Sequence, residues 1–112
     1  MTTSRQKGSR YELRSVEYLK KMGYSCYRCP QKVAWIGKGR AISINADAFG
    51  IIDVIGIKRT SVCFVQVKFL GENGTHVSSE TRRKLAALPA PPNSVYLHIW
   101  RKGARAPEVE GF

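Results

Sequence analysis

The sequence SVCFVQVKFL, residues 61–70, predicts a strand that is buried on both faces of a sheet. Seven of its ten residues are apolar, yet Gln66 and Lys68 lie inside the apolar run. Side chains alternate along a strand, so these two polar groups point to the same face. A lysine buried among apolar groups is costly unless a partner offsets it. We therefore expect further polar groups on that face.

The preceding run, IIDVIGI at residues 51–57, predicts a neighbouring strand with one carboxylate, Asp53, among apolar residues. If residues 59–60 form a two-residue turn, paired residue numbers sum to 119 and Asp53 falls opposite Gln66. The turn lacks the Asn-Gly signature, so a shift of two in either direction stays open. Each of these registers keeps Asp53 on the face of Gln66 and Lys68.

Residues 9–22 have the pattern of an amphipathic helix that ends at Gly23. Its apolar stripe comprises Leu13, Val16 and Leu19. Glu12 lies on or beside this stripe, which places a carboxylate at the core or its rim. Ser9 and Glu12 also fit a capping box at a helix start, and this alternative stays open.

The other predicted elements complete an α/β fold in which a central mixed β-sheet is flanked by helices. They are a flexible basic arm at 1–8, strands at 24–29 and 94–100, a hairpin from VAWI and AISI, a helix at 79–88, and a frayed tail at 101–112. The length of 112 residues indicates a single domain, 1–112.

The net charge of +11 favours a polyanionic partner, most often nucleic acid. The basic groups that we expect to contact phosphates are Arg5, Lys7, Arg10, Lys38, Arg40, Arg82, Arg83 and Lys84. No apolar run approaches the ~20 residues that span a bilayer, and the basic start does not resemble a signal peptide. These features predict a cytoplasmic protein with no membrane partner.

The three cysteines are too few and too scattered to predict a disulfide framework. Cys26 and Cys29 form a C-x-x-C that raises the question of zinc, with Cys63, His76 or His98 to complete a site. A structural zinc site usually has a second close pair, and this sequence has none.

Glu12, Asp53, Gln66 and Lys68 together suit hydrolysis of a phosphodiester. Two carboxylates hold Mg²⁺ through oxygen, and a neighbouring lysine orients the attacking water or stabilises the developing anion. The alternative is a buried structural ion pair between Asp53 and Lys68.

The spacing D-x(12)-Q-x-K, with a glutamate in the preceding helix, resembles the PD-(D/E)xK nuclease superfamily in its Q-x-K variant. The start KGSRYELRSVEYLKKMGYSCYR, at 7–28, looks more specifically like archaeal-type Holliday junction resolvases. The resemblance covers about half of the chain. It implies a restriction-endonuclease-like fold and a homodimer that cuts four-way junction DNA in recombination and repair. It also implies Mg²⁺ as cofactor, with Mn²⁺ expected to substitute.

The resemblance implies that Glu12, Asp53 and Lys68 are catalytic. It makes the backbone carbonyl of Val67 a further metal ligand and brings Arg10 and Arg28 to the scissile region. The family usually has glutamate where Gln66 stands. The Gln66 amide oxygen can still ligate the metal, but it brings no negative charge. Asp47 either supplies that negative charge or caps the turn before the strand.

Two other functions stay open. One is a PD-(D/E)xK nuclease acting on flap, nicked or duplex DNA, and the other is a non-catalytic nucleic-acid-binding protein. For the dimer, we expect contacts from apolar residues that the core does not need, namely Trp35, Leu85, Leu88 and Trp100.

Overall fold

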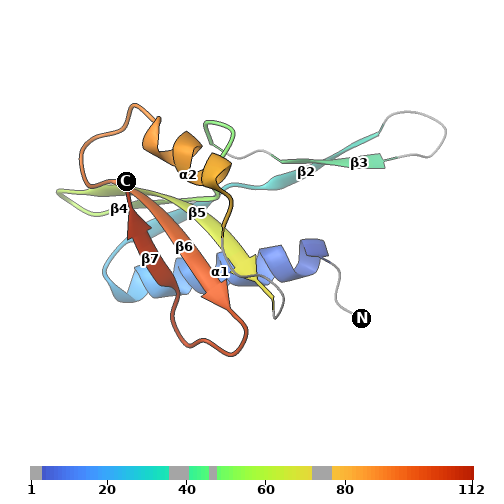
Figure 1. The fold of residues 1–112 in the computed structure, drawn as a ribbon, viewed down its shortest axis with the longest axis horizontal. Helices are drawn as coiled ribbons and strands as arrows, with labels where there is room; N and C mark the ends of the chain where they lie inside the picture. The colour runs from blue at the N-terminus through green and yellow to red at the C-terminus, as the bar shows by residue number, and fades with distance from the viewer. Residues whose placement is uncertain (1–3, 36–40, 46–47, 72–76) are drawn as a thin grey trace.

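Strand β5 (Val62–Leu70) is the central strand of a five-stranded sheet in this computed structural model (Figure 1). The sheet order is β1 (Ser25–Arg28), β4 (Val54–Ile57), β5, β6 (Val95–Arg101) and β7 (Glu108–Gly111). Strands β5 and β6 are parallel, and the other neighbouring pairs are antiparallel. The predicted mixed sheet of an α/β protein is confirmed.

The structure describes residues 4–35, 41–45, 48–71 and 77–112, and side chains within 9–30, 48–71 and 77–112. Strands β2 (Gln31–Trp35) and β3 (Ala41–Asn45) pair antiparallel in a separate two-stranded sheet, which confirms the predicted hairpin (Figure 1). Its tip, with Lys38 and Arg40, lies outside the described residues, as does His76.

Helix α1 (Ser4–Lys21) begins five residues before its predicted start, so residues 4–8 are helical and the prediction of a flexible arm there is wrong. Its buried residues are Tyr11, Glu12, Ser15 and Leu19. Leu13, predicted to face the core, is 50% exposed. The reason is that the Tyr11 ring stacks on Phe69 of β5, with centroids 4.3 Å apart, and this turns a different stripe toward the sheet.

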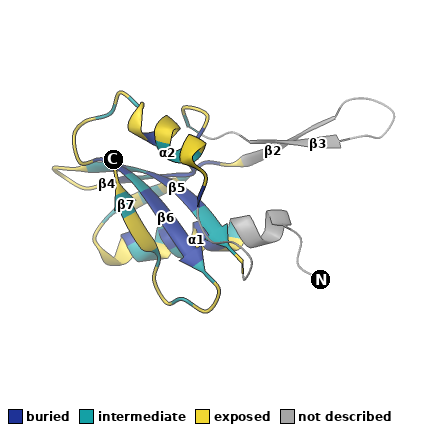
Figure 2. Ribbon diagram, viewed as in Figure 1, coloured by how far each residue is buried: buried dark blue, intermediate teal, exposed yellow. Residues whose placement is uncertain are grey.

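Each face of the sheet is covered by one helix. On the α1 side, Cys63, Val65 and Val67 pack with Val54 and Trp100. On the other side, α2 (Ser79–Ala86) contributes Leu85 to a cluster that includes Ile52, Leu97 and Ile99. Figure 2 shows β5 and β6 as the buried centre of the molecule. The alternating residues of β5 therefore serve two cores, as a strand buried on both faces requires.

Two of the residues expected at a dimer contact are buried in these cores. Leu85 and Trp100 are 0% and 1% exposed, so that prediction is wrong for both. Leu88 packs partly against the α2-side cluster, and the side chain of Trp35 is outside the described part.

A buried polar cluster joins α1 to β6. Trp100 Nε1 donates a hydrogen bond of 2.7 Å to Ser15 Oγ, and His98 Nδ1 lies 3.0 Å from the same oxygen. The Tyr18 ring meets the imidazole edge-on. Burial lowers the pKa of His98 from 6.5 to about 4, so the imidazole is neutral at physiological pH.

The segment after Arg101 contains a strand, so the prediction of a frayed tail is wrong. Residues of β7 pair with β6, from Tyr96↔Gly111 to Ile99↔Glu108. An ion pair of 3.0 Å between Arg82 and Glu110 ties this strand to α2. Within the described residues, none of the helices could cross a membrane.

Candidate active site

Strands β4 and β5 pair in the predicted register. Val54↔Val65 and Ile57↔Val62 are Cα partners, and both pairs sum to 119. The ladder ends at Val54, directly after Asp53 in the chain. The apolar pattern sets which face of each strand is buried, and among the registers that it leaves open the structure has the one expected for a two-residue turn at residues 59–60.

Directly before β4, the side chain of Asp53 forms a hydrogen bond to the backbone of β5. Its Oδ2 accepts a hydrogen bond of 2.8 Å from the backbone N–H of Val67, and its own N–H donates to the carbonyl of Val65 at 2.9 Å. Asp53 is buried. The carboxylate is thereby fixed at the point where β4 and β5 separate.

Gln66 is also buried, and its Oε1 has no hydrogen-bond partner among the described residues. An unmet buried acceptor costs about 1–3 kcal/mol, so its presence needs a reason. Lys68 lies two residues further along the same face and is only half-buried. Lys68 is therefore less buried than its place inside an apolar run predicts, because β5 reaches the edge of the core at this position.

Glu12 is buried in α1, and its Oε1 lies 3.6 Å from Arg28 Nε at the end of β1. Arg28 also donates to the hydroxyl of Ser9. Since α1 begins at Ser4, Ser9 and Glu12 are inside the helix, and the capping-box alternative is wrong. Glu12 therefore contacts a residue of strand β1.

The end of β1 connects Glu12 with Asp53. Arg28 pairs with Val54, and the next residue, Cys29, donates its N–H to the Asp53 carbonyl at 2.8 Å. A series of contacts thus runs from Glu12 through Arg28 and Cys29 to Asp53, and from Asp53 to Val67. Asp47 lies outside the described residues.

This arrangement offers oxygen ligands of the kind that Mg²⁺ takes. In the described part of the chain, no three His, Cys, Asp or Glu side chains group as metal ligands. Mg²⁺, however, commonly takes one or two carboxylates and keeps several waters. The carboxylates of Asp53 and Glu12 and the Gln66 amide oxygen, which has no hydrogen-bond partner among the described residues, are oxygen atoms of the type that such a shell uses.

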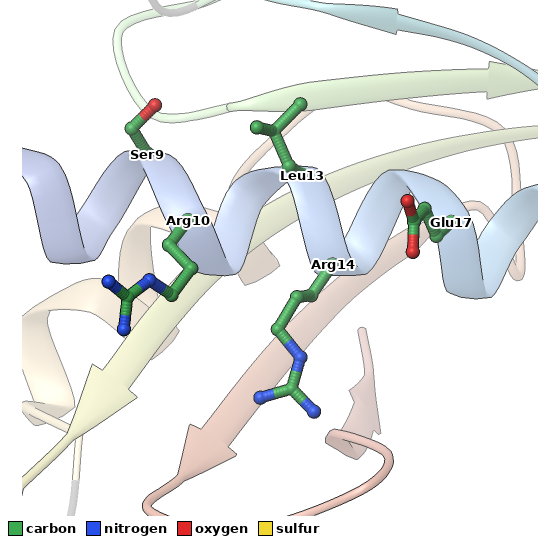
Figure 3. A pocket seen from close by; sticks show the side chains of 5 residues that line it. All are labelled: Ser9, Arg10, Leu13, Arg14 and Glu17. Atoms are coloured by element: carbon green, nitrogen blue, oxygen red, sulfur yellow. The ribbon is translucent and has the colours of Figure 1, made fainter.

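The basic residues divide into free and engaged groups. Arg10 is exposed on α1, and it extends to the same side as Arg14 (Figure 3). Arg82 is paired with Glu110, and Lys84 with Glu80 at 3.3 Å. Arg83 is exposed. Arg5 and Lys7 belong to α1, but their side chains lie outside the described part.

Arg14 is a residue that the sequence analysis missed. Its guanidinium lies 4.4 Å from the Trp100 ring centroid and donates to the Ala104 carbonyl at 2.6 Å. It lines a surface groove with Ser9, Arg10, Leu13 and Glu17 (Figure 3). The spacing of four from Arg10 was the available signal, because residues four apart share a helix face.

Among the described residues, the three cysteines do not group as metal ligands. Cys26 faces α1, with Sγ 3.9 Å from the Val16 carbonyl, and Cys63 is buried two strands away. Between them, a Cβ on Gly56 would come within 2.8 Å of Cys63 Sγ, so glycine is required there. Burial raises the pKa of the Cys63 thiol to about 11, and burial also raises that of Cys26.

Comparison with known proteins assigns the chain to no family. No family model matches its sequence, no curated protein matches it, and no solved structure matches its fold.

Proposed function

We propose that this protein is a metal-dependent DNA endonuclease with a restriction-endonuclease-like fold, and that it resolves four-way junctions as a homodimer. The observation that carries the proposal is the Asp53 carboxylate, held by the Val67 N–H, next in sequence to Gln66, whose buried Oε1 has no hydrogen-bond partner among the described residues. A structural ion pair would explain the carboxylate. It would leave the amide oxygen without a purpose.

Glu12, Asp53, Gln66 and the Val67 carbonyl would hold Mg²⁺ or Mn²⁺. When bound, the metal lowers the pKa of a coordinated water and stabilises charge that develops on the phosphate. The hydrogen bond from the Val67 N–H to Asp53 Oδ2 holds the Asp53 carboxylate in one orientation before any metal binds. Metal binding therefore does not have to supply the conformational entropy that is lost when this side chain is ordered.

Lys68 and Arg28 would act on the phosphate. Lys68, half-buried next to Gln66 on β5, would orient the attacking water or stabilise the anionic transition state. The Arg28 side chain is 30% exposed, so its guanidinium could donate to a phosphate oxygen as well as lie near Glu12. Arg10 and the net charge of +11 would supply affinity for the backbone.

The test is a cleavage assay on labelled four-way junction, flap, nicked duplex and plain duplex of equal length. We expect paired cuts near the branch point with Mg²⁺ or Mn²⁺, and none with EDTA. Preferred cutting of flap or nicked DNA would support the related nuclease activity in place of junction resolution. Binding without cutting in either metal would mean a non-catalytic nucleic-acid-binding protein.

A further inference from the structure

The turn that leads into β4 presents an aromatic ring in a strained conformation. Phe49 has φ of 56° and is 73% exposed, and Gly50 follows with φ of 75°. The Ile51 N–H closes the turn on the Ala48 carbonyl at 3.2 Å. Two consecutive positive φ values are typical of a turn occupied by Asn-Gly, and a bulky residue there is an outlier. The exposed ring gains little from burial, so core packing does not account for it.

The Phe49 ring forms one wall of a small apolar pocket. The pocket has a volume of about 100 Å³ and is lined by Phe49, Phe64, Leu88, Pro89, Ala90 and Pro91. Drug-sized ligands occupy roughly 300–1,000 Å³, so this space suits a single planar ring system. The rings of Phe49 and Phe64 meet edge-on with centroids 6.0 Å apart, which leaves ring faces available for stacking.

The pocket continues into a basic groove through a shared residue, Pro91. The groove is lined by Ile57, Lys58, Arg59, Thr60, Ser61, Val62, Pro91, Pro92, Asn93 and Ser94. Its lining includes two cations, three hydroxyl groups and no acidic residue. Lys58 Nζ lies 4.3 Å above the Tyr24 ring, and Arg59 is exposed. The apolar pocket suits a nucleobase, and the cationic groove beside it suits the phosphate to which that base is joined.

The pocket adjoins the candidate active site along the same strand. Phe64 and Gln66 are two apart on β5, so they share a face and are about 7 Å apart along the strand. Phe49 precedes Asp53 by four residues, and the intervening turn is held by the Ala48–Ile52 bridge. A ligand in the pocket would therefore lie next to the proposed metal site.

We propose that this pocket and groove bind an unpaired nucleotide of the DNA substrate. The base stacks on the face of Phe49 and meets the Phe64 ring edge-on, and the adjoining phosphates contact Arg59 and Lys58. The inference depends on the proposed function only for the identity of the ligand as DNA. It gives the protein a physical means to prefer branched or single-stranded DNA, because fully paired bases cannot reach the slot.

The experiment measures binding in EDTA, where no metal-dependent cleavage can occur. Anisotropy of a labelled single-stranded dT12 and a duplex of equal length is compared for the wild type, Phe49→Ala and Met22→Ala. Stacking of one base predicts roughly tenfold weaker dT12 binding by Phe49→Ala, with duplex binding within about twofold of wild type. Met22→Ala removes an equally apolar, 48% exposed side chain at the end of α1 and should bind as the wild type does.

Two further variants test the contribution of the aromatic ring and that of the cationic groove separately. Phe49→Trp should keep dT12 affinity, and its added indole fluorescence should be quenched by dT12 beyond the change seen for the wild type. Arg59→Glu should weaken dT12 binding more than Arg105→Glu, which makes the same charge change at an exposed loop position. Retained melting temperatures verify that each variant is folded.

Equal dT12 affinity of Phe49→Ala and wild type would overturn the inference, as would an equal loss for single strand and duplex. A change of oligomeric state in Phe49→Ala, seen by light scattering with unchanged DNA binding, would assign the pocket to a protein contact and also overturn it. If junctions are never cut while the dT12 effect holds, the proposed endonuclease function fails and the nucleotide pocket stands. If junctions are cut and the dT12 effect is absent, the nucleotide pocket fails and the proposed endonuclease function stands.

Discussion

At the scale of single residues, Asp53 and Glu12 are the groups on which the proposed chemistry most depends. Asp53→Asn keeps an acceptor for the Val67 N–H, and Glu12→Gln keeps the side-chain size, so both proteins should fold. Each removes a charge from the metal shell, and we expect at least a hundredfold slower junction cleavage, roughly the loss of one transition-state interaction. Affinity for DNA should change little, because the basic surface is intact.

The matched control is Glu17→Gln, which makes the same change on the exposed side of α1. Single-turnover cleavage rates in Mg²⁺ and anisotropy in EDTA measure the two quantities separately. Cleavage by Asp53→Asn at the wild-type rate would show that the metal site is misplaced.

Gln66 gives a prediction of opposite sign. Gln66→Glu replaces a neutral ligand by a carboxylate, so it should stay active and bind Mg²⁺ more tightly. Without metal, two buried carboxylates would lie side by side, and we expect a lower melting temperature in EDTA than for wild type. Thermal melts across a Mg²⁺ titration measure both effects. A folded but inactive Gln66→Glu would mean that Gln66 has a role other than holding metal.

Lys68 is expected to matter for rate and little for stability. Lys68→Ala should cleave at least a hundredfold more slowly. Because Lys68 is half-buried and not enclosed by the core, its removal should shift the melting temperature by only a few degrees. Lys21→Ala, at an exposed position of α1, is the control for loss of one positive charge. A Lys68→Ala protein that unfolds would favour the structural ion pair with Asp53.

At the scale of elements, the contact between α1 and β6 makes stability depend on pH. His98 titrates near 6.5 when unfolded and at about 4 when folded, so the unfolded chain takes up a proton that the folded one rejects. Its contribution is fully present above pH 6.5 and is lost as the pH falls toward 4. The loss amounts to about 3 kcal/mol.

Urea unfolding between pH 7.5 and 4.5 measures this dependence. The glutamine of the His98→Gln variant cannot titrate. The difference in the free energy of unfolding between wild type and His98→Gln should therefore shrink or reverse as the pH falls through that range. Parallel curves for His98→Gln and wild type would show that another group dominates the acid sensitivity.

The elements also show what the sequence could and could not predict. Strand β5 and the shared face of Gln66 and Lys68 follow from alternation and apolar runs, which are local signals. The register with β4 depends in addition on the two-residue turn at residues 59–60, which the apolar pattern alone does not set. The rotation of α1 was not predictable from its own pattern, because the stack of Tyr11 on Phe69 joins residues far apart in sequence. Strand β7 is short and charged, and its state depends on pairing with β6.

The candidate site divides in the same way. The four polar residues could be found because each one interrupts an apolar pattern, and local rules detect such interruptions. The engagement of Arg82 by Glu110 could not be found, because nothing in an Arg-Arg-Lys run indicates a partner 28 residues away. The predicted basic cluster on α2 therefore offers less free charge than its sequence suggests.

At the scale of the whole molecule, the proposal requires a dimer. Junction selectivity needs two basic surfaces at a fixed separation, so that a second arm binds with a gain from effective concentration. A two-fold dimer also places two active sites on symmetry-related strands. We expect a dimer at micromolar concentration that binds a four-way junction more tightly than a duplex of equal length at physiological salt.

Light scattering gives the mass, and anisotropy at several salt concentrations gives the two affinities and their salt slopes. The expected slope is steeper for the junction, since more phosphates are contacted. A monomer with equal affinity for junction and duplex would remove the assignment as a resolvase and leave the metal-dependent chemistry to be judged by the cleavage assay.

The thiol beneath α1 makes this fold convenient to follow in solution. Cys63 is 1% exposed, and with a pKa of about 11 it stays protonated at neutral pH, whereas alkylating reagents attack the thiolate. Iodoacetamide can therefore modify it only during the moments when the helix has lifted from the sheet. The half-buried Cys26, above the same glycine, provides an internal reference. The rate at which Cys63 gains the mass of the alkyl group thus measures how often α1 separates from the sheet.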